Sequence, residues 1–204
     1  MSTASDCITA DLYESLRHCP GQTSLPGIRP RALGIPKSHI LSFPKLPSID
    51  DKDADMESIA TYDGDFLLEA DKKFLFMDLL SSASSVKSES QGEGASKSYL
   101  NTATLFHPSV GPAVTGFSRL VLNDDFVWLV QQRDGRWRVI GNEMIETETK
   151  PAQDSGQSVT DSSGTTFTAT VSDVSPAPFY VGKIRTEKGI YDCKTNTLEA
   201  VDNA

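Results

Sequence analysis

The chain of 204 residues is long enough for one domain with an arm or a large insertion, and its 38% hydrophobic and 23% charged residues are typical of a folded protein. It has 28 acidic and 19 basic side chains, which gives a net charge of −9. Because a nucleic-acid reader needs a basic face to displace counterions from phosphates, this charge argues against specific recognition of DNA or RNA.

The lack of a recognisable targeting signal and the few cysteines lead us to expect a cytoplasmic protein. No apolar stretch approaches the roughly 20 residues needed to cross a bilayer, so no membrane contact is expected. The N-terminal sequence MSTASDCITADLYESL has no basic residue before an apolar run, which argues against a secretion signal. The scattered cysteines Cys7, Cys19 and Cys193 are expected to stay free thiols in a reducing compartment.

An irregular N-terminal arm is predicted over 1–30, because prolines and glycines interrupt it and apolar residues show little periodicity. At most one helical turn is expected there, at 11–16. Two short strands are then predicted at 32–35 and 40–43, separated by Pro36, which cannot sit in a central ladder.

The next feature is an acidic segment, residues 50–71, in which nine side chains are acidic and only Lys52 is basic. Clustered carboxylates are ligands for calcium. However, the run 50–55 has no glycine at the turn position, and Thr61 stands where a calcium-binding loop carries its twelfth-position glutamate. A solvated loop is therefore favoured over a metal site, and no cofactor is predicted.

Two turn signals, Asp-Gly at 63–64 and Asp-Lys-Lys at 71–73, separate short apolar runs and predict successive antiparallel strands. A long hairpin is then predicted over 78–107, with a glycine-containing tip at 91–95 between two alternating arms. Both arms are so polar that neither face of the hairpin is expected to be buried in the subunit's own core.

One helix is predicted over 109–122, where apolar side chains recur at helical spacing from Val114 to Val121. The most distinct hairpin follows it. The runs FVWLVQQ at 126–132 and WRVIG at 137–141 surround an Asp-Gly turn, which is the strongest short-range hairpin signal.

Towards the C-terminus, a polar loop is expected over 143–163, a half-buried strand over 165–174, and a tail with one weak strand over 181–204. The whole pattern lacks β-α-β alternation. It predicts a mainly β fold: an antiparallel β-sandwich or barrel with one flanking α-helix, a long extended hairpin, and N- and C-terminal arms around a central domain at 31–180.

No set of residues predicts catalysis. Motifs of serine hydrolases, dinucleotide-binding proteins and P-loop proteins are absent from the sequence, and His18, His39 and His107 lack the spacing of a zinc site. Trp128 and Trp137 would support a sugar-binding face if they were exposed. Aromatic residues in such an alternation are more commonly core residues or cross-strand pairs.

The order of elements over 61–180 resembles the major tail tube proteins of long-tailed bacteriophages and the related tubes of contractile injection systems. The resemblance rests on the polar hairpin 78–107, the helix 109–122, the strand pair FVWLVQQRDGRWRVIGNE at 126–143 and the segment QDSGQSVTDSSGTTFTATVSDVSPAPFY at 153–180. It implies a virion protein without enzymatic activity, made in the bacterial host cytoplasm. Its copies would form hexameric rings, stacked with other tail proteins around a channel that DNA crosses without specific binding.

The polar hairpin supports the same expectation, because a two-stranded ribbon is unstable alone and a ring that pairs strand edges removes the hazard of an open edge. Glu89 and Glu93 are candidates to line the channel, where negative charge repels phosphate. The side chains predicted to contact the next subunit or ring are Ser84, Val86, Lys87, Glu89, Gln91, Glu93, Lys97 and Tyr99.

Two alternatives remain from the sequence. A neck or tail-terminator protein shares the fold and forms a single ring in place of a tube. A carbohydrate-binding β-sandwich module belongs to another functional class and predicts that Trp128 or Trp137 is exposed.

Overall fold

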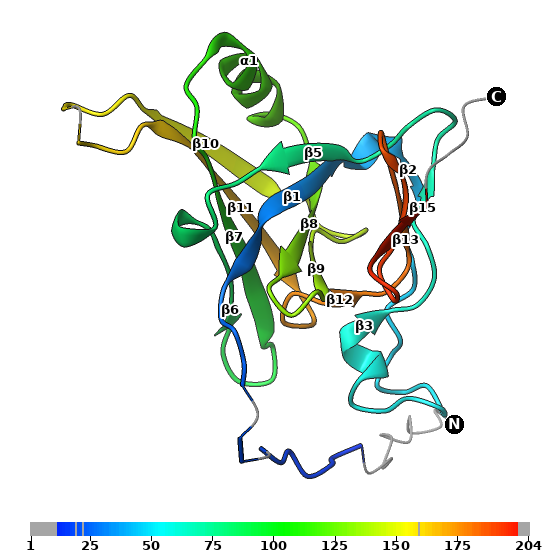
Figure 1. Ribbon diagram of the computed structural model, residues 1–204. Coiled ribbons are helices and arrows are strands. Elements are labelled where there is room, and N and C mark those ends of the chain that lie inside the picture. The colour runs from blue at the N-terminus through cyan, green and yellow to red at the C-terminus, as the bar shows by residue number, and fades with distance from the viewer. Residues whose placement is uncertain (1–11, 19, 22, 159, 200–204) are drawn as a thin grey trace.

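The computed structural model describes residues 12–18, 20–21, 23–158 and 160–199 (Figure 1). Within them, the predicted mainly β fold with one α-helix is confirmed. The helix α1 spans Pro112–Val121, and three 3-10 helices are η1 (Lys37–His39), η2 (Ser58–Ala60) and η3 (Ser81–Ala83). The strands are β1 (Ile28–Pro36), β2 (Ile40–Ser42), β3 (Thr61–Tyr62), β4 (Leu67–Leu68), β5 (Leu75–Asp78), β6 (Ser85–Gln91), β7 (Ser98–His107), β8 (Phe126–Gln132), β9 (Trp137–Ile140), β10 (Glu148–Asp154), β11 (Gly164–Asp173), β12 (Phe179–Tyr180), β13 (Lys183–Thr186), β14 (Gly189–Asp192) and β15 (Thr197–Glu199).

The sheets are stacked in layers, which Figure 1 shows from left to right. A six-stranded sheet of order β3-β12-β9-β8-β1-β5 lies in the middle. A four-stranded antiparallel sheet of order β10-β11-β7-β6 covers one of its faces together with α1, and the three-stranded sheet β13-β14-β15 covers the other. A further pair, β2 and β4, lies beside this last sheet.

The layers pack against one another through two hydrophobic cores. The first core lies between the four-stranded and six-stranded sheets and includes Leu105, Trp128 and Phe167, with Phe117 of α1 packed against it. The second core lies on the other face of the six-stranded sheet. Its buried members include residues of the central sheet, of the connection between β3 and β5, and of β13 and β14: Leu33, Ile35, Tyr62, Phe66, Phe74, Val127, Leu129, Trp137, Val139, Tyr180, Ile184, Tyr191 and Cys193.

Strand β8 is buried on both faces, which explains its unbroken apolar run. Phe126, Trp128 and Val130 belong to the first core, while Val127 and Leu129 belong to the second. The predicted hairpin of β8 with β9 is confirmed by antiparallel pairing from Trp128–Ile140 to Gln131–Trp137.

The prediction that neither face of the 78–107 hairpin is buried was wrong. Strand β7 lies between β11 and β6, and Asn101, Ala103 and Leu105 are fully buried on its inner side. The polar Asn101 is accommodated because its amide donates to Ser175 O and accepts from Ala177 N. The threonines that alternate along β7 lie on its outer face, while the residues between them are buried in the core.

The strands predicted around 61–78 form, but they do not pair with one another in succession. β3 pairs in parallel with β12, β4 pairs with β2, and β5 pairs with β1. The predicted polar loop over 143–163 was also wrong in part, because β10 lies within it as an edge strand. An edge strand pairs on one side only and lies at the margin of the core, so a largely polar sequence can form it.

Three further expectations are corrected or refined at the ends of the chain. The C-terminal residues are better packed than a tail, since β13 and β14 contribute to the second core. Residues 12–16 are not helical, and β1 begins slightly before the predicted end of the N-terminal arm. Cys7 and Cys19 lie outside the described residues, whereas Cys193 is buried and not in a disulfide.

In the part of the chain that the structure describes, no helix has the length and apolarity to cross a membrane.

Candidate assembly surface

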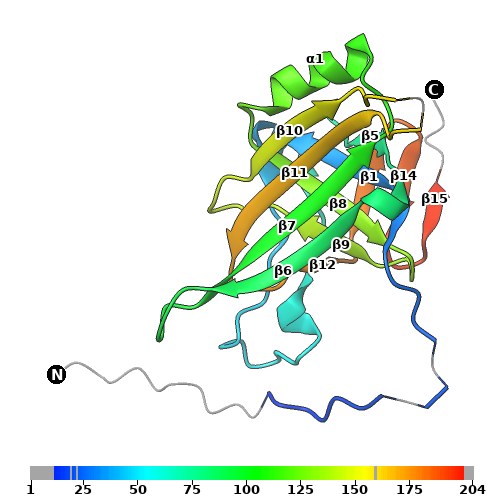
Figure 2. The same ribbon diagram turned by 90° about the vertical axis from the view of Figure 1, so that its left-hand side faces the viewer.

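The outer face of the four-stranded sheet points away from the first core and faces the viewer in Figure 2. Side chains alternate across it: Phe167 and Ala169 of β11 are buried, and the threonines that alternate with them are half-buried. The outward residues of the two central strands are Leu100, Thr102, Thr104 and Phe106 from β7 and Thr166, Thr168, Thr170 and Ser172 from β11. Threonine therefore dominates the middle of this face.

Charged side chains on this face lie on its two edge strands. The register aligns Glu148 of β10 with Lys87 of β6 through a threonine on each central strand. On each edge a lysine and a glutamate form an ion pair, Lys87–Glu89 at 2.7 Å and Lys150–Glu148 at 2.9 Å. Asp154 adds one carboxylate at the end of β10. The face is thus polar with little net charge.

The backbone of β6 is unpaired along its outer edge. In the described residues its only ladder partner is β7. The Phe106 N–H donates to Ser84 Oγ and its carbonyl accepts from Leu80 N, so both groups of Phe106 face the β6 side. Because these directions alternate along a strand, Lys87 bonds to β7, while the N–H of Ser88 points to the open edge.

Strand β10 is the opposite edge, and its only ladder partner in the described part of the chain is β11. The direction of the backbone groups alternates along each strand, so the register of β7 on β11 and of β11 on β10 shows which groups of β10 are unpaired. The backbone nitrogens of Thr149, Pro151 and Gln153 lie on the open side. Proline is tolerated at such a position because it has no N–H to give to a ladder. Each edge of the sheet therefore carries free backbone groups.

Two of the predicted contact residues serve the subunit's own fold. Ser84 is 7% exposed, and its Oγ donates to Leu80 O and accepts from Phe106 N. Val86 packs against the first core. Their side chains lie on the inner side of the sheet and are closed to a neighbour, which corrects the prediction for these two residues.

The other predicted residues are spread over the outer face and the hairpin tip. Glu89 is exposed on the outer face in its ion pair with Lys87, whereas Glu93 is exposed in the tip. The two lumen candidates therefore do not form one cluster. The remaining positions are Lys97, exposed in the tip, Gln91, whose amide donates to Ser98 and Ser172, and Tyr99, half-buried on β7.

Both tryptophans are buried. Trp128 and Trp137 are each 1% exposed, and the Trp128 indole N–H donates to Thr149 Oγ1 at 3.1 Å. The carbohydrate-binding alternative required an exposed tryptophan, so its prediction was wrong. These side chains are core residues instead.

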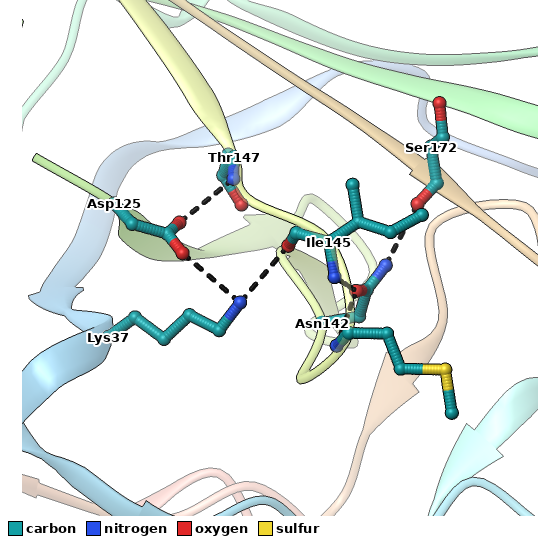
Figure 3. Close-up of polar contacts among 7 residues, drawn as sticks. Lys37, Asp125, Asn142, Ile145, Thr147 and Ser172 are labelled. Carbon is teal, nitrogen blue, oxygen red and sulfur yellow. Dashed lines mark hydrogen bonds and ion pairs between the residues drawn. The ribbon is translucent and has the colours of Figure 1, made fainter. Parts of the chain in front are cut away.

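A network of polar contacts fixes the loop between β9 and β10 (Figure 3). Asn142 accepts from the N–H groups of Met144 and Ile145 and donates to Ser172 O. Lys37 Nζ lies 3.1 Å from both Asp125 Oδ2 and Ile145 O, and Asp125 Oδ1 accepts from Thr147 N. The network holds the Met144 side chain out at 94% exposure beside the start of β10. No hydrophobic periodicity in the sequence indicates how this loop is held.

One buried carboxylate lies near this network. Asp173, at the end of β11, is 7% exposed, and its Oδ2 has no hydrogen-bond partner among the described residues. Burial raises the pKa of Asp173, although hydrogen bonds from Val174 N and from the Asn142 amide act in the opposite direction.

Nothing in the described residues indicates a metal centre. No group of three or more His, Cys, Asp or Glu side chains is placed there to hold an ion. His18 is exposed, and His107 Nδ1 lies 2.7 Å from the carbonyl of Asp78. Comparisons with models of protein families, with curated proteins and with solved structures give no match to this chain.

Proposed function

We propose that the chain is a structural subunit of a phage-type tail tube, whose copies form hexameric rings stacked around a channel. The observation that carries the proposal is a four-stranded sheet whose two edge strands, of seven residues each, have no ladder partner on their outer side among the described residues. Open edges invite uncontrolled strand pairing unless something covers them. Pairing β6 of one copy with β10 of the next covers both edges, and a rotation that closes gives a ring.

The strand directions support this pairing. All neighbouring strands of the sheet are antiparallel, so its two edge strands run in opposite directions. Rotation about a ring axis preserves the tilt and direction of each strand relative to that axis. The β6 strand of one copy is then antiparallel to the β10 strand of the next, and the joint continues the pattern within the sheet.

The composition of the outer face supports its role as the channel wall. Binding to DNA depends on cations that neutralise phosphates. On this face Lys87 and Lys150 are each paired with a glutamate, and the central strands present mainly threonine. Such a wall gives passing DNA no array of free cations. The charge of the face is set by these few residues and not by the net −9.

The β6–β7 hairpin supports contact between stacked rings. Its tip extends beyond the rest of the sheet in Figure 2, and Glu93 and Lys97 are exposed there. The proposed location is the virion tail, after synthesis in the host cytoplasm. The proposed partners are other copies of the chain and further tail proteins, and the subunit needs no catalytic group.

Negative-stain electron microscopy of the purified chain over a range of concentrations tests the proposal. Rings or tubes with sixfold symmetry are expected. Single rings that never stack would favour the neck or tail-terminator alternative. A chain that stays strictly monomeric at the highest attainable concentration would contradict both.

A further inference from the structure

Five of the eight arginines in the chain gather at one end of the six-stranded sheet, and we call them the arginine cluster. They come from the beginning of β1 and from the β8–β9 hairpin, which lie side by side in the sheet order β9-β8-β1. The members are Arg29, Arg31, Arg133, Arg136 and Arg138. This is a local excess of positive charge on a chain of net charge −9.

The cluster has few counter-charges of its own. Among the described carboxylates, only Asp134 lies within ion-pair distance, and it binds Arg136. Arg31 instead donates to the amide oxygen of Gln131 at 2.9 Å, and Arg138 donates to the carbonyl of Ala177 at 2.8 Å. Its neutral partner leaves the positive charge of the Arg31 guanidinium group uncompensated, whereas Arg138 is also attracted by Asp134, which Arg136 already binds.

Aromatic rings hold several of these side chains in place. The guanidinium carbon of Arg138 lies 3.7 Å from the centre of the Phe179 ring. Arg31 lies over the rings of Trp137 and Tyr191, at 6.0 and 5.6 Å. Stacking orients a guanidinium group without neutralising it, so its donors stay aligned for a carboxylate.

The acidic segment is the complementary surface on the same chain. Asp51 and Asp55 hold its loop by accepting from Ser48 N and Ser58 N, which lowers their pKa values. Asp50 and Asp53 lie in the same loop, where they are exposed and have no ion pair among the described residues. The segment therefore also presents charge that its own subunit leaves uncompensated.

The acidic segment and the arginine cluster both contribute side chains to one groove, but they form no ion pair with each other in the described residues. Asp55 and Glu57 of the acidic segment line this groove together with Arg136 and Phe179, and its volume is about 520 Å³. No ion pair joins the acidic segment to the arginine cluster within the described part of the subunit. Arg136 is the member of the arginine cluster that lines this groove.

We infer that the arginine cluster of one copy binds the acidic segment of the next copy. The inference rests on the proposed self-assembly and names the charged contact that steers it. Complementary charges fix the register of an interface and suppress wrong pairings, which a subunit with open strand edges requires. A passing DNA duplex is the competing ligand for the same guanidinium groups.

Charge reversal of both surfaces, separately and mixed, tests the inference. The arginine variant is Arg29→Glu/Arg133→Glu, the acid variant is Asp50→Lys/Asp53→Lys, and Arg119→Glu/Lys188→Glu is the control with the same change of charge elsewhere. Association is measured by sedimentation velocity at low and high salt, after circular dichroism shows that each variant is folded. Each reversed variant alone should associate about tenfold more weakly than wild type or worse, whereas the control should not.

Mixing gives the sharper result, because every contact between an arginine variant and an acid variant is again attractive. Assembly should return in the mixture and weaken with added salt. Wild-type rings that neither reversal nor salt affects would overturn the inference and leave the proposed tube intact. A wild-type chain that stays monomeric would overturn both. Duplex DNA binding that only the arginine variant loses, with association unchanged, would assign the cluster to DNA and also overturn the inference.

Discussion

Gly34 of β1 lies directly against the indole ring of Trp128 on β8. The two residues are opposite each other in the ladder, and a β-carbon on Gly34 would come within 2.8 Å of Trp128 Cζ3. The bare backbone at this point lets the large ring fill the first core. Trp128 in turn meets Phe117 of α1 edge-on, at 6.4 Å between ring centres, so this contact links the central sheet to the helix.

Gly34→Ala should therefore destabilise the fold by about 1–3 kcal/mol, because the added methyl group must displace a packed ring. Gly116→Ala is the matched control. Gly116 lies within α1 with open space around its Cα, so alanine should raise stability by up to about 1 kcal/mol. Urea denaturation measures the change in unfolding free energy for each variant, and a change of the same sign in both would show that the Trp128 ring does not require a glycine at position 34.

Proline on β6 should separate assembly from folding. Ser88→Pro removes an N–H that points to the open edge, so the subunit should stay folded while ring formation is lost. Lys87→Pro removes an N–H that bonds to β7 and should lower the unfolding temperature by several degrees. Thermal unfolding and electron microscopy together read out both effects. Normal tubes from folded Ser88→Pro would rule out pairing through this edge.

Asn142→Ala should loosen the loop between β9 and β10. The substitution removes one donor and two accepted hydrogen bonds from a residue that is 9% exposed, which should cost about 1–3 kcal/mol. Asn123→Ala, at an exposed position after α1, should cost far less. Hydrogen exchange should show faster exchange of Met144 and Ile145 amides in the Asn142 variant. Unchanged protection of these amides would contradict the anchoring role.

Asp173 predicts a pH dependence of stability. Burial raises its pKa in the folded chain, so the folded state holds this proton at pH values where the unfolded state has released it. Its contribution to stability is complete below the unfolded pKa, about 3.9, and falls as the pH rises through the folded value. Asp173→Asn does not titrate, so it should become more stable relative to wild type as the pH rises from about 4 to about 7. If the unfolding free energies of Asp173→Asn and wild type differed by the same amount at about pH 4 and about pH 7, the proposed role of Asp173 would be contradicted.

Local signals explain which elements could be predicted from the sequence. The β8–β9 hairpin has an Asp-Gly turn between apolar runs, and the inward Phe167 of β11 alternates with threonines, so both were predicted correctly. Strand β10 has no such alternation, because its inner side chains at Thr149 and Gln153 are polar. Its position is set by the ladder with β11, which is a tertiary interaction.

The candidate sites depend even more on pairing between distant segments. Arg31 meets Gln131 only because β1 and β8 pair, although the two residues are 100 positions apart in the chain. The sequence pattern likewise could not show that Ser84 and Val86 point inward while Lys87 and Glu89 point outward. That division follows from the register of β6 on β7 and from the core beneath it.

In the proposed ring, the four-stranded sheets of neighbouring copies close a channel wall through their β6 and β10 edges. A cryo-electron microscopy reconstruction of the assembled chain would show this joint itself. The expected structure is a sixfold ring in which β6 of each copy pairs antiparallel with β10 of the next, and in which Thr102, Thr104, Thr168 and Thr170 face the axis. A ring with this threonine face turned outward, or with both edges still unpaired, would contradict it.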